Sequence, residues 1–256
     1  MNRIDRKFHY LKENSKKALI PFVTCGELSV EETANLVVEI DKTGASIVEI
    51  GVPYSDPLAD GPVIQESYCR ALKNGTKLKD VFKCVELIRE ESEIPLVIMV
   101  YYNIVFSYGV ERFLSKISEV GVDGIIVPDI PLEERHDIME ICNNEGVHLI
   151  PLVAPTSKER IKAITNESKG FVYCVSSNGT TGERSKLNDG VNEYLNTVKS
   201  LTDLPICVGF GISSRDIVNK VKNHCDGVIV GSAVVRRMFQ GKDEVIEFLK
   251  ELNLEL

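Results

Sequence analysis

Residues 46–65 read SIVEIGVPYSDPLADGPVIQ: an apolar run that contains Glu49, a loop that contains Asp60, and the start of a helix-like stretch. A carboxylate inside an apolar strand is costly to bury unless its pKa shifts, it finds a partner or it takes part in chemistry. A strand-end glutamate can also reach solvent or a lysine, and Ala-Asp-Gly is an ordinary turn sequence, so structural roles stay open for both residues. The pair nevertheless predicts a two-carboxylate active site where this strand ends.

The same alternation of strand, loop and helix continues along the whole chain. Eight short apolar runs, rich in branched side chains, are separated by longer amphipathic stretches. Their near-continuous apolar character is typical of parallel strands that are covered on both faces. The predicted strands are residues 19–24, 47–51, 96–101, 124–127, 147–153, 171–175, 206–210 and 227–230.

Several stretches between these strands carry helix signals. Ser29 is followed three residues later by Glu32, which predicts a capping box at a helix start. Residues 213–221 have apolar side chains at helical spacing. Glycines end or follow such stretches at Gly44, Gly121, Gly146 and Gly241, where helix-stop residues are expected.

Eight strand–helix units in 256 residues predict an α/β fold, a (β/α)8 TIM barrel. No linker or low-complexity segment divides the chain, so we expect a single domain over residues 1–256. Residues 4–11 and 62–72 exceed the minimal repeat and predict an extra N-terminal helix and an extra helix after the second strand. A doubly wound open sheet has the same alternation, but the polar and glycine-rich residues after most strands favour a barrel, where all strand ends meet at one mouth.

Composition narrows the classes of function. The net charge is −8 and the pI is about 5.2, so there is no overall positive field to attract nucleic acid or an anionic membrane. No apolar run approaches the roughly 20 residues of a membrane span, and the first residues are too polar for a signal peptide. We therefore expect a cytoplasmic protein that binds neither nucleic acid nor membrane.

The metal-binding and redox residues are scattered. The seven cysteines form no CxxC pair and mostly have apolar neighbours, so they are expected to be reduced core residues. None of the four histidines lies at metal-ligand spacing from another histidine or a cysteine, and no metal site is expected.

Glycine-rich segments after the last three strands predict a phosphate site. Gly209 and Gly211 follow the seventh strand, Gly231 and Ser232 follow the eighth, and residues 179–182 read GTTG after the sixth. Such segments let backbone N–H groups and helix starts face an anion, and barrels commonly bind phosphate in the last two loops. One motif alone could equally make a tight turn, but the three together favour phosphate.

The chain resembles the tryptophan synthase alpha subunit over nearly its full length. Residues 53–65, PYSDPLADGPVIQ, are similar to the family segment P-[FY]-S-D-P-x-A-D-G-P-x-I-Q. Supporting segments are PFVT at 21–24, YYN at 101–103, PDIP at 128–131, GTTG at 179–182 and GFGIS at 209–213. The resemblance implies a carbon–carbon lyase of tryptophan biosynthesis, which splits indole-3-glycerol phosphate into indole and glyceraldehyde 3-phosphate by a retro-aldol reaction.

The resemblance also implies roles for single residues. Glu49 is similar to the family acid/base that protonates indole C3, and Asp60 to the carboxylate that takes charge at indole N1. The expected substrate-pocket residues are Phe22, Tyr101, Asp129, Tyr173 and Thr181, and the expected phosphate-binding residues are Gly182, Gly211, Gly231 and Ser232. From the sequence, core packing is an equally open role for Phe22. Acid–base chemistry of this kind needs no cofactor in this chain.

A partner and a lid are implied in the same way. In the resembling family the loop at residues 53–59, here with Pro53 and Asp56, contacts a beta subunit that carries pyridoxal phosphate, in an assembly of two alpha and two beta subunits. Residues 176–191 resemble the loop that closes over substrate. The alternatives are a stand-alone lyase that releases indole without a beta subunit, a sugar-phosphate isomerase of similar barrel form, and a non-catalytic regulator, which the intact Glu49 and Asp60 disfavour.

Overall fold

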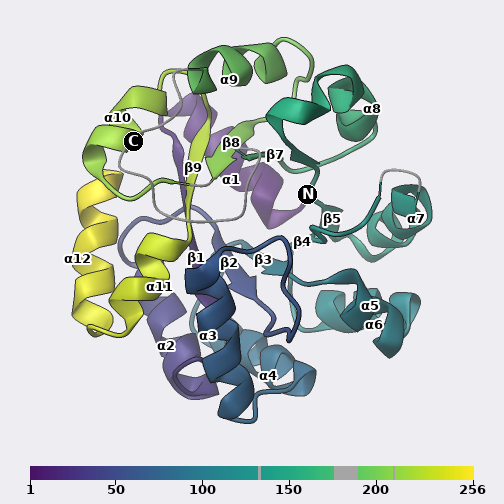
Figure 1. Ribbon diagram of the computed structural model, residues 1–256, viewed down its shortest axis with the longest axis vertical. Coiled ribbons are helices and arrows are strands. Elements are labelled where there is room, and N and C mark those ends of the chain that lie inside the picture. Colours follow the sequence, from purple (N-terminus) through teal and green to yellow (C-terminus); the bar gives the residue numbers. More distant parts are fainter. Residues whose placement is uncertain (132–133, 176–189, 210) are drawn as a thin grey trace.

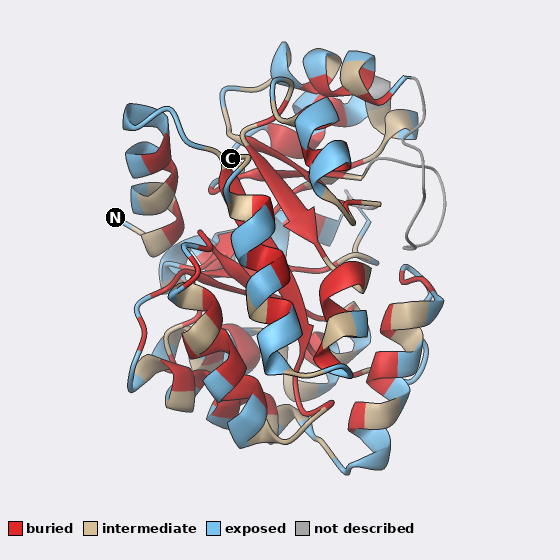
Figure 2. Ribbon diagram, turned by 90° about the vertical axis from the view of Figure 1, so that its left-hand side faces the viewer, coloured by how far each residue is buried: buried red, intermediate tan, exposed pale blue. Residues whose placement is uncertain are grey.

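The computed structural model describes all residues except 132–133, 176–189 and 210, and within this part nine parallel strands are surrounded by helices (Figure 1). The near-continuous apolar strands are buried on both faces, as the sequence predicts (Figure 2). The strands are β1 (Ala18–Thr24), β2 (Val48–Gly51), β3 (Leu96–Met99), β4 (Gly124–Ile126), β5 (His148–Leu149), β6 (Leu152–Val153), β7 (Val172–Val175), β8 (Ile206–Gly209) and β9 (Gly227–Val230).

The sheet curls so that its two ends meet in one short segment. Its order is β5-β4-β3-β2-β1-β9-β8-β7-β6, so the end strands β5 and β6 are consecutive pieces of residues 148–153. Ile150 N donates to Ile125 O on one side (2.9 Å), and Tyr173 N donates to Pro151 O on the other (2.8 Å). The barrel prediction is therefore confirmed, and the open-sheet alternative is wrong.

The fifth predicted strand, residues 147–153, differs from the expectation because it is two strands of two residues each. Pro151 lies between them and has no N–H to donate, so a continuous ladder cannot pass through it. β3 and β4 also end earlier than predicted, at Met99 and Ile126, because the chain turns there into the loops of the mouth.

The predicted helix signals are confirmed where the structure describes them. Ser29 N donates to Glu32 Oε2 (2.9 Å) and Glu32 N donates to Ser29 Oγ (3.1 Å), which is the predicted capping box. Gly146 follows its helix with φ +73°, a left-handed conformation that favours glycine.

The two predicted extra helices are α1 and α3. The helices are α1 (Arg3–Glu13), α2 (Val30–Asp41), α3 (Pro62–Lys73), α4 (Leu78–Arg89), α5 (Tyr102–Tyr108), α6 (Val110–Glu119), α7 (Arg135–Glu145), η2 (Pro155–Arg160), α8 (Ile161–Thr165), α9 (Val191–Lys199), α10 (Arg215–Val221), α11 (Ser232–Met238) and α12 (Lys242–Asn253).

Helix α1 covers the end of the barrel where the strands begin. The ring of Phe8 packs against Phe171, just before β7, with a centroid distance of 5.6 Å. Asp5 pairs with His148 Nε2 at 2.9 Å, at the first residue of β5. The Phe8–Phe171 contact and the Asp5–His148 pair close the end of the barrel where the strands begin. The opposite end, where the strands finish, is therefore the one left for a ligand.

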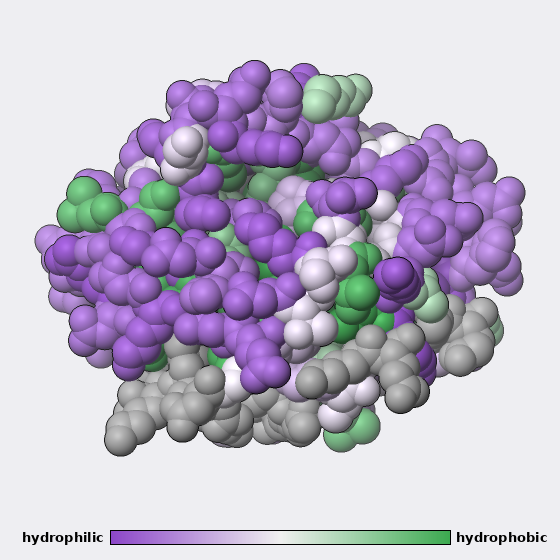
Figure 3. Space-filling view, turned by 90° about the horizontal axis from the view of Figure 1, so that it is seen from above, coloured by the Kyte–Doolittle hydropathy of each residue, from purple (hydrophilic) through white to green (hydrophobic). Residues whose placement is uncertain are grey.

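The face of the molecule in Figure 3 is mainly hydrophilic, and most of the cysteines are buried. Figure 3 shows one face, on which hydrophilic side chains predominate and hydrophobic ones appear in small separate patches. Six of the seven free cysteines are buried as expected, while Cys69 is exposed on α3, so the core prediction is wrong for that residue. Among the helices in the described ranges, none is long and apolar enough to cross a membrane.

Candidate active site

The two carboxylates of the opening segment lie at the mouth of the barrel. Glu49 is in β2, beside Phe22 of β1 in the strand register, and Asp60 lies in the loop just before α3. Both are almost completely buried, with relative exposures of 2% and 3%. The structure therefore brings together the two residues that the sequence singled out.

Burial gives the two groups different proton affinities. It raises the pKa of Glu49 to about 8, with a further contribution from the negative charge of Asp60. It raises the pKa of Asp60 only to about 6, because a hydrogen bond from Tyr101 favours the charged form. Near pH 7 the pocket thus holds one protonated and one ionised carboxyl group, which is how paired carboxylates divide acid and base roles.

Tyr101 holds Asp60 in place. Its Oη donates to Asp60 Oδ2 at 2.7 Å and accepts a hydrogen bond from Ala59 N at 3.0 Å. Its ring stacks on Tyr54, with centroids 4.9 Å apart. Gln65 adds a bond from its side-chain amide to the Asp60 carbonyl oxygen (2.8 Å), so the loop is tied on both sides.

Two aromatic rings enter the mouth where strand glycines leave space. A Cβ added at Gly51 would lie 2.4 Å from Phe22 Cζ, and one added at Gly209 would lie 2.5 Å from the Tyr173 ring. Since side chains alternate along a strand, Phe22, Glu49 and Gly51 share the inner face. Burial, and then the charges of Glu49 and Asp60, raise the pKa of Tyr173.

The glycine-rich ends of β8 and β9 differ in conformation. Gly211 has φ +85°, and an added Cβ there would meet nothing within 4 Å. Gly231 caps α11, and an added Cβ would meet only Phe22 Cβ, at 3.9 Å. Ser232 begins that helix, so its N–H is among those with no acceptor inside the helix.

Of three further predicted site residues, the structure describes only Asp129. Asp129 is exposed and its Oδ1 accepts a hydrogen bond from Tyr102 N (2.8 Å), so it supports the start of α5 at the mouth. Thr181 and Gly182 lie outside the described residues, as does most of the predicted lid at 176–191.

The predicted partner loop, residues 53–59, has both buried and exposed positions. Pro53 is buried and Asp56 is exposed, with its Oδ2 accepting a hydrogen bond from Ser55 Oγ at 2.6 Å. Leu58 was expected in this loop without a role of its own, and its side chain is 84% exposed. A leucine that follows a proline does not show from the sequence whether it is exposed.

Sequence reasoning also missed Tyr68. It lies in α3 and is fully buried, and its Oη would be 2.8 Å from a Cβ placed on Gly51. In the sequence this tyrosine could not be told from a core residue on the inner face of an amphipathic helix.

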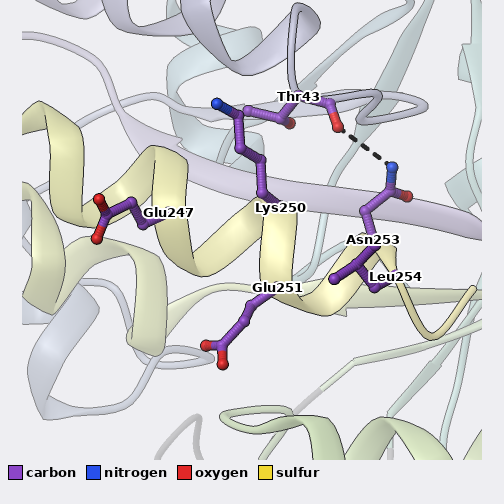
Figure 4. Close-up of a pocket in the computed structure, with 6 residues that line it drawn as sticks. All are labelled: Thr43, Glu247, Lys250, Glu251, Asn253 and Leu254. Atoms are coloured by element: carbon purple, nitrogen blue, oxygen red, sulfur yellow. Dashed lines mark hydrogen bonds between the residues drawn. The ribbon is translucent and has the colours of Figure 1, made fainter.

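A groove elsewhere is structural. It lies where α12 ends beside the loop between α2 and β2, and Asn253 Nδ2 donates there to Thr43 O at 3.2 Å (Figure 4). Because that loop precedes β2, the groove is at the end of the barrel opposite the carboxylates. In the part of the chain that the structure describes, no group of three or more His, Cys, Asp or Glu residues is placed to hold a metal ion.

A (β/α)8 barrel with two buried, differently tuned carboxyl groups and two aromatic rings at the carboxyl ends of its strands defines a barrel enzyme. The comparisons give the family. Residues 8–255 match the family model "Tryptophan synthase alpha chain". The chain therefore belongs to the tryptophan synthase alpha chain family.

Individual relatives agree over nearly their full lengths. The tryptophan synthase alpha chain of Clostridium beijerinckii is 62% identical, with 99% of this chain and 98% of the relative covered. That of Clostridium kluyveri is 53% identical, with both chains fully covered. A solved structure of Mycobacterium tuberculosis tryptophan synthase has a TM-score of 0.92 at 34% identity, covering 99% of this chain and 98% of that one.

Proposed function

We propose that the protein cleaves indole-3-glycerol phosphate to indole and glyceraldehyde 3-phosphate, the alpha reaction of L-tryptophan synthesis. The observation that carries the proposal is the pair of buried carboxyl groups, Glu49 with a pKa of about 8 and Asp60 with a pKa of about 6. Family membership supports the same reaction. The direct test is to incubate the purified chain with indole-3-glycerol phosphate and measure both products.

The retro-aldol step needs one proton delivered and one removed. Protonated Glu49 gives its proton to indole C3, which becomes tetrahedral and leaves positive charge on the ring nitrogen. Ionised Asp60 stabilises that charge. As the bond between C3 and the side-chain carbon breaks, the hydroxyl on that carbon loses its proton and becomes the aldehyde, and the carboxylate left on Glu49 takes this proton. The catalyst is returned to its starting state.

The remaining predicted residues supply binding. We assign Phe22 and Tyr173 to the indole ring, because flat aromatic contact contributes beyond buried area. We assign the phosphate to backbone N–H groups at Gly211, Gly231 and Ser232, with Thr181 and Gly182 of the preceding loop. Tyr101 and Asp129 complete the proposed pocket, Tyr101 by holding Asp60.

Substitution of the glycines tests the phosphate assignment. Gly231→Val and Gly211→Val should each weaken binding of the substrate and of plain glycerol phosphate by about tenfold or more, because a side chain would block the approach of the anion to the backbone. Calorimetric titration of both ligands measures this.

The control is Gly146→Val. Gly146 has φ +73° and open space around it, so a valine there would impose the same kind of backbone strain as a valine at Gly211. Gly146 lies at the other end of the barrel. Weaker substrate binding with unchanged glycerol phosphate binding would contradict the assignment, as would an equal effect of the control variant.

We further propose that the mouth binds a tryptophan synthase beta subunit, which holds the pyridoxal phosphate of the second reaction. The relative from Mycobacterium tuberculosis is described as a tryptophan synthase. Leu58 on the 53–59 loop is 84% exposed, and Phe106 on the neighbouring α5 is 65% exposed. The Tyr54–Tyr101 stack joins this loop to the start of α5, the helix that carries Phe106. We propose that both exposed apolar side chains contact the beta subunit.

Asp56 is the proposed ion-pairing residue of that surface. Asp56→Ala should weaken binding to the beta subunit by several-fold and reduce its stimulation of indole formation, because a rim charge contributes to association. Calorimetry with the cognate beta subunit measures the affinity, and Glu247→Ala, an exposed acidic residue on α12, is the control. Unchanged affinity would remove Asp56 from the interface, and no binding by the wild type would favour a stand-alone lyase.

We propose one domain over residues 1–256, supported by a hydrophobic core that runs from Ile4 to Leu252. We propose a cytoplasmic location, supported by seven free thiols of the kind that persist in a reducing compartment. We propose two alpha and two beta subunits as the assembly.

A further inference from the structure

The hydroxyl of Tyr68 is buried without a hydrogen-bond partner. Among the described residues, only this oxygen and one guanidinium nitrogen of Arg135 are fully buried side-chain polar atoms in that condition. Other buried phenols are satisfied: Tyr101 donates to Asp60, and Tyr194 donates to Val153 O. Since buried polar groups in native proteins are nearly always bonded, this orphan hydroxyl requires an explanation.

The hydroxyl lies in the mouth of the barrel. Gly51 is the next residue after Glu49 on the inner face of β2, and the space that a Cβ on Gly51 would occupy is taken by the Phe22 ring and by Tyr68 Oη. Tyr68 Oη is therefore at the level of Gly51, one inward-facing position nearer the end of β2 than Glu49, beside the ring proposed to contact indole. Burial raises the pKa of Tyr68, and Asp60, Tyr101 and Glu49 raise it further. The phenol keeps its proton and is available as a donor.

The helix that carries Tyr68 is fixed to the barrel on both sides of this residue. Ser67 Oγ donates to Glu27 Oε2 at 2.5 Å, and Arg70 Nη2 donates to Glu27 Oε1 at 2.6 Å. Ser67 Oγ also lies 2.6 Å from Thr24 Oγ1 at the end of β1. These bonds anchor α3, so the position of the hydroxyl is set by the fold and not by a freely rotating surface helix.

We propose that Tyr68 contacts the substrate and that its hydroxyl donates a hydrogen bond to the chain hydroxyl on the carbon bonded to indole C3. The inference rests on the proposed function. In the proposed binding mode N1–H faces Asp60 and the phosphate faces the glycine-rich loops, which leaves the two chain hydroxyls without an assigned partner. The hydroxyl beside C3 lies between N1–H and the phosphate and next to Glu49.

The chemistry of that group suits a phenol donor. During cleavage the chain hydroxyl becomes an aldehyde oxygen, which can only accept hydrogen bonds. A fixed O–H donor serves the alcohol and the aldehyde alike, and it can stabilise negative charge on this oxygen as the bond breaks. Because the donor has no partner in the free pocket, the substrate replaces no existing bond.

The test compares Tyr68→Phe with the wild type on two ligands. The first is indole-3-glycerol phosphate; the second is indole-3-propanol phosphate, which keeps the ring, the chain length and the phosphate but lacks both chain hydroxyls. We expect kcat/KM for cleavage to fall about 3- to 10-fold, the range of one hydrogen bond, while the Kd of the propanol analogue stays within about twofold. A purely structural role would weaken both.

Tyr194→Phe is the matched control, because it removes a buried phenol hydroxyl that is already satisfied and lies outside the site. It should melt below the wild type and retain its kcat/KM, whereas Tyr68→Phe should melt at or above the wild type, since it removes an unpaired buried group. The inference would be overturned if Tyr68→Phe kept the wild-type kcat/KM, or if its kcat/KM for the substrate and its affinity for the analogue fell by the same factor. In either case cleavage by the wild type and by Tyr194→Phe would still support the proposed function. Absence of cleavage by both the wild type and the control would overturn the proposed function and this inference together.

Discussion

Glu49→Gln is expected to lower kcat for indole-3-glycerol phosphate cleavage by at least about 10²-fold while leaving substrate affinity within roughly tenfold. The amide keeps the shape of the side chain but has no proton to deliver to C3, and general acid–base groups typically contribute this much. Single-turnover cleavage and calorimetric binding of substrate measure the two quantities. Near-normal turnover would remove Glu49 from the chemistry.

The pKa of Glu49 gives this prediction two further readouts. In the wild type, kcat/KM should decline above about pH 8 as Glu49 loses its proton. The folded-state pKa lies above the unfolded value of 4.5, so the folded protein binds more protons between about pH 4.5 and 8, and stability falls as the pH rises through that window. Glu49→Gln should therefore be more stable than the wild type, by a margin that grows from pH 5 to pH 8. Parallel stability curves would contradict the buried, proton-binding state.

Asp60→Asn is the second large effect and should lower kcat/KM by about 10²- to 10³-fold. It removes the negative charge beside the indole nitrogen while keeping the size of the side chain, and a group aimed at charge in a transition state contributes on this scale. Steady-state kinetics measures the loss. Wild-type turnover would return Asp60 to the role of a turn residue.

Tyr101→Phe separates the charge of Asp60 from its placement. The wild-type kcat/KM should decline below about pH 6, where Asp60 becomes protonated. The Tyr101 hydrogen bond lowers the pKa of Asp60, so its removal should move this acid limb to higher pH while leaving the carboxylate present. An unmoved limb would mean that another group controls it.

Local sequence signals predicted most of the barrel because they act over few residues. The apolar runs, the Ser29–Glu32 capping box and the turn glycines are each decided within one element. The break of the fifth strand needed more, because a proline in an apolar run shows a lost donor but not which neighbour each half will pair with.

In the candidate site, too, the features decided within one segment could be predicted and those that depend on several strands could not. Glu49 and Asp60 could be predicted because a carboxylate in an apolar strand is costly and the motif around Asp60 is specific. The space above Gly51 and Gly209 could not, because it depends on which rings arrive from other strands. Pro53 was expected at the partner surface but is buried, since its exposure depends on how the loop folds back.

The two-residue strands on either side of Pro151 have a consequence for the dynamics of the whole molecule. The ladder that joins β1 to β9 pairs residues 18–21 with 227–230, whereas β5 and β6 each contribute two pairs to their neighbours. The break between β5 and β6, within residues 148–153, is a seam in the barrel. Strands β1 to β5 before it and strands β6 to β9 after it each form a continuous half of the sheet. Amide hydrogen exchange should therefore show the seam opening at lower free energy than the β1–β9 ladder, with each half-barrel behaving as a cooperative unit.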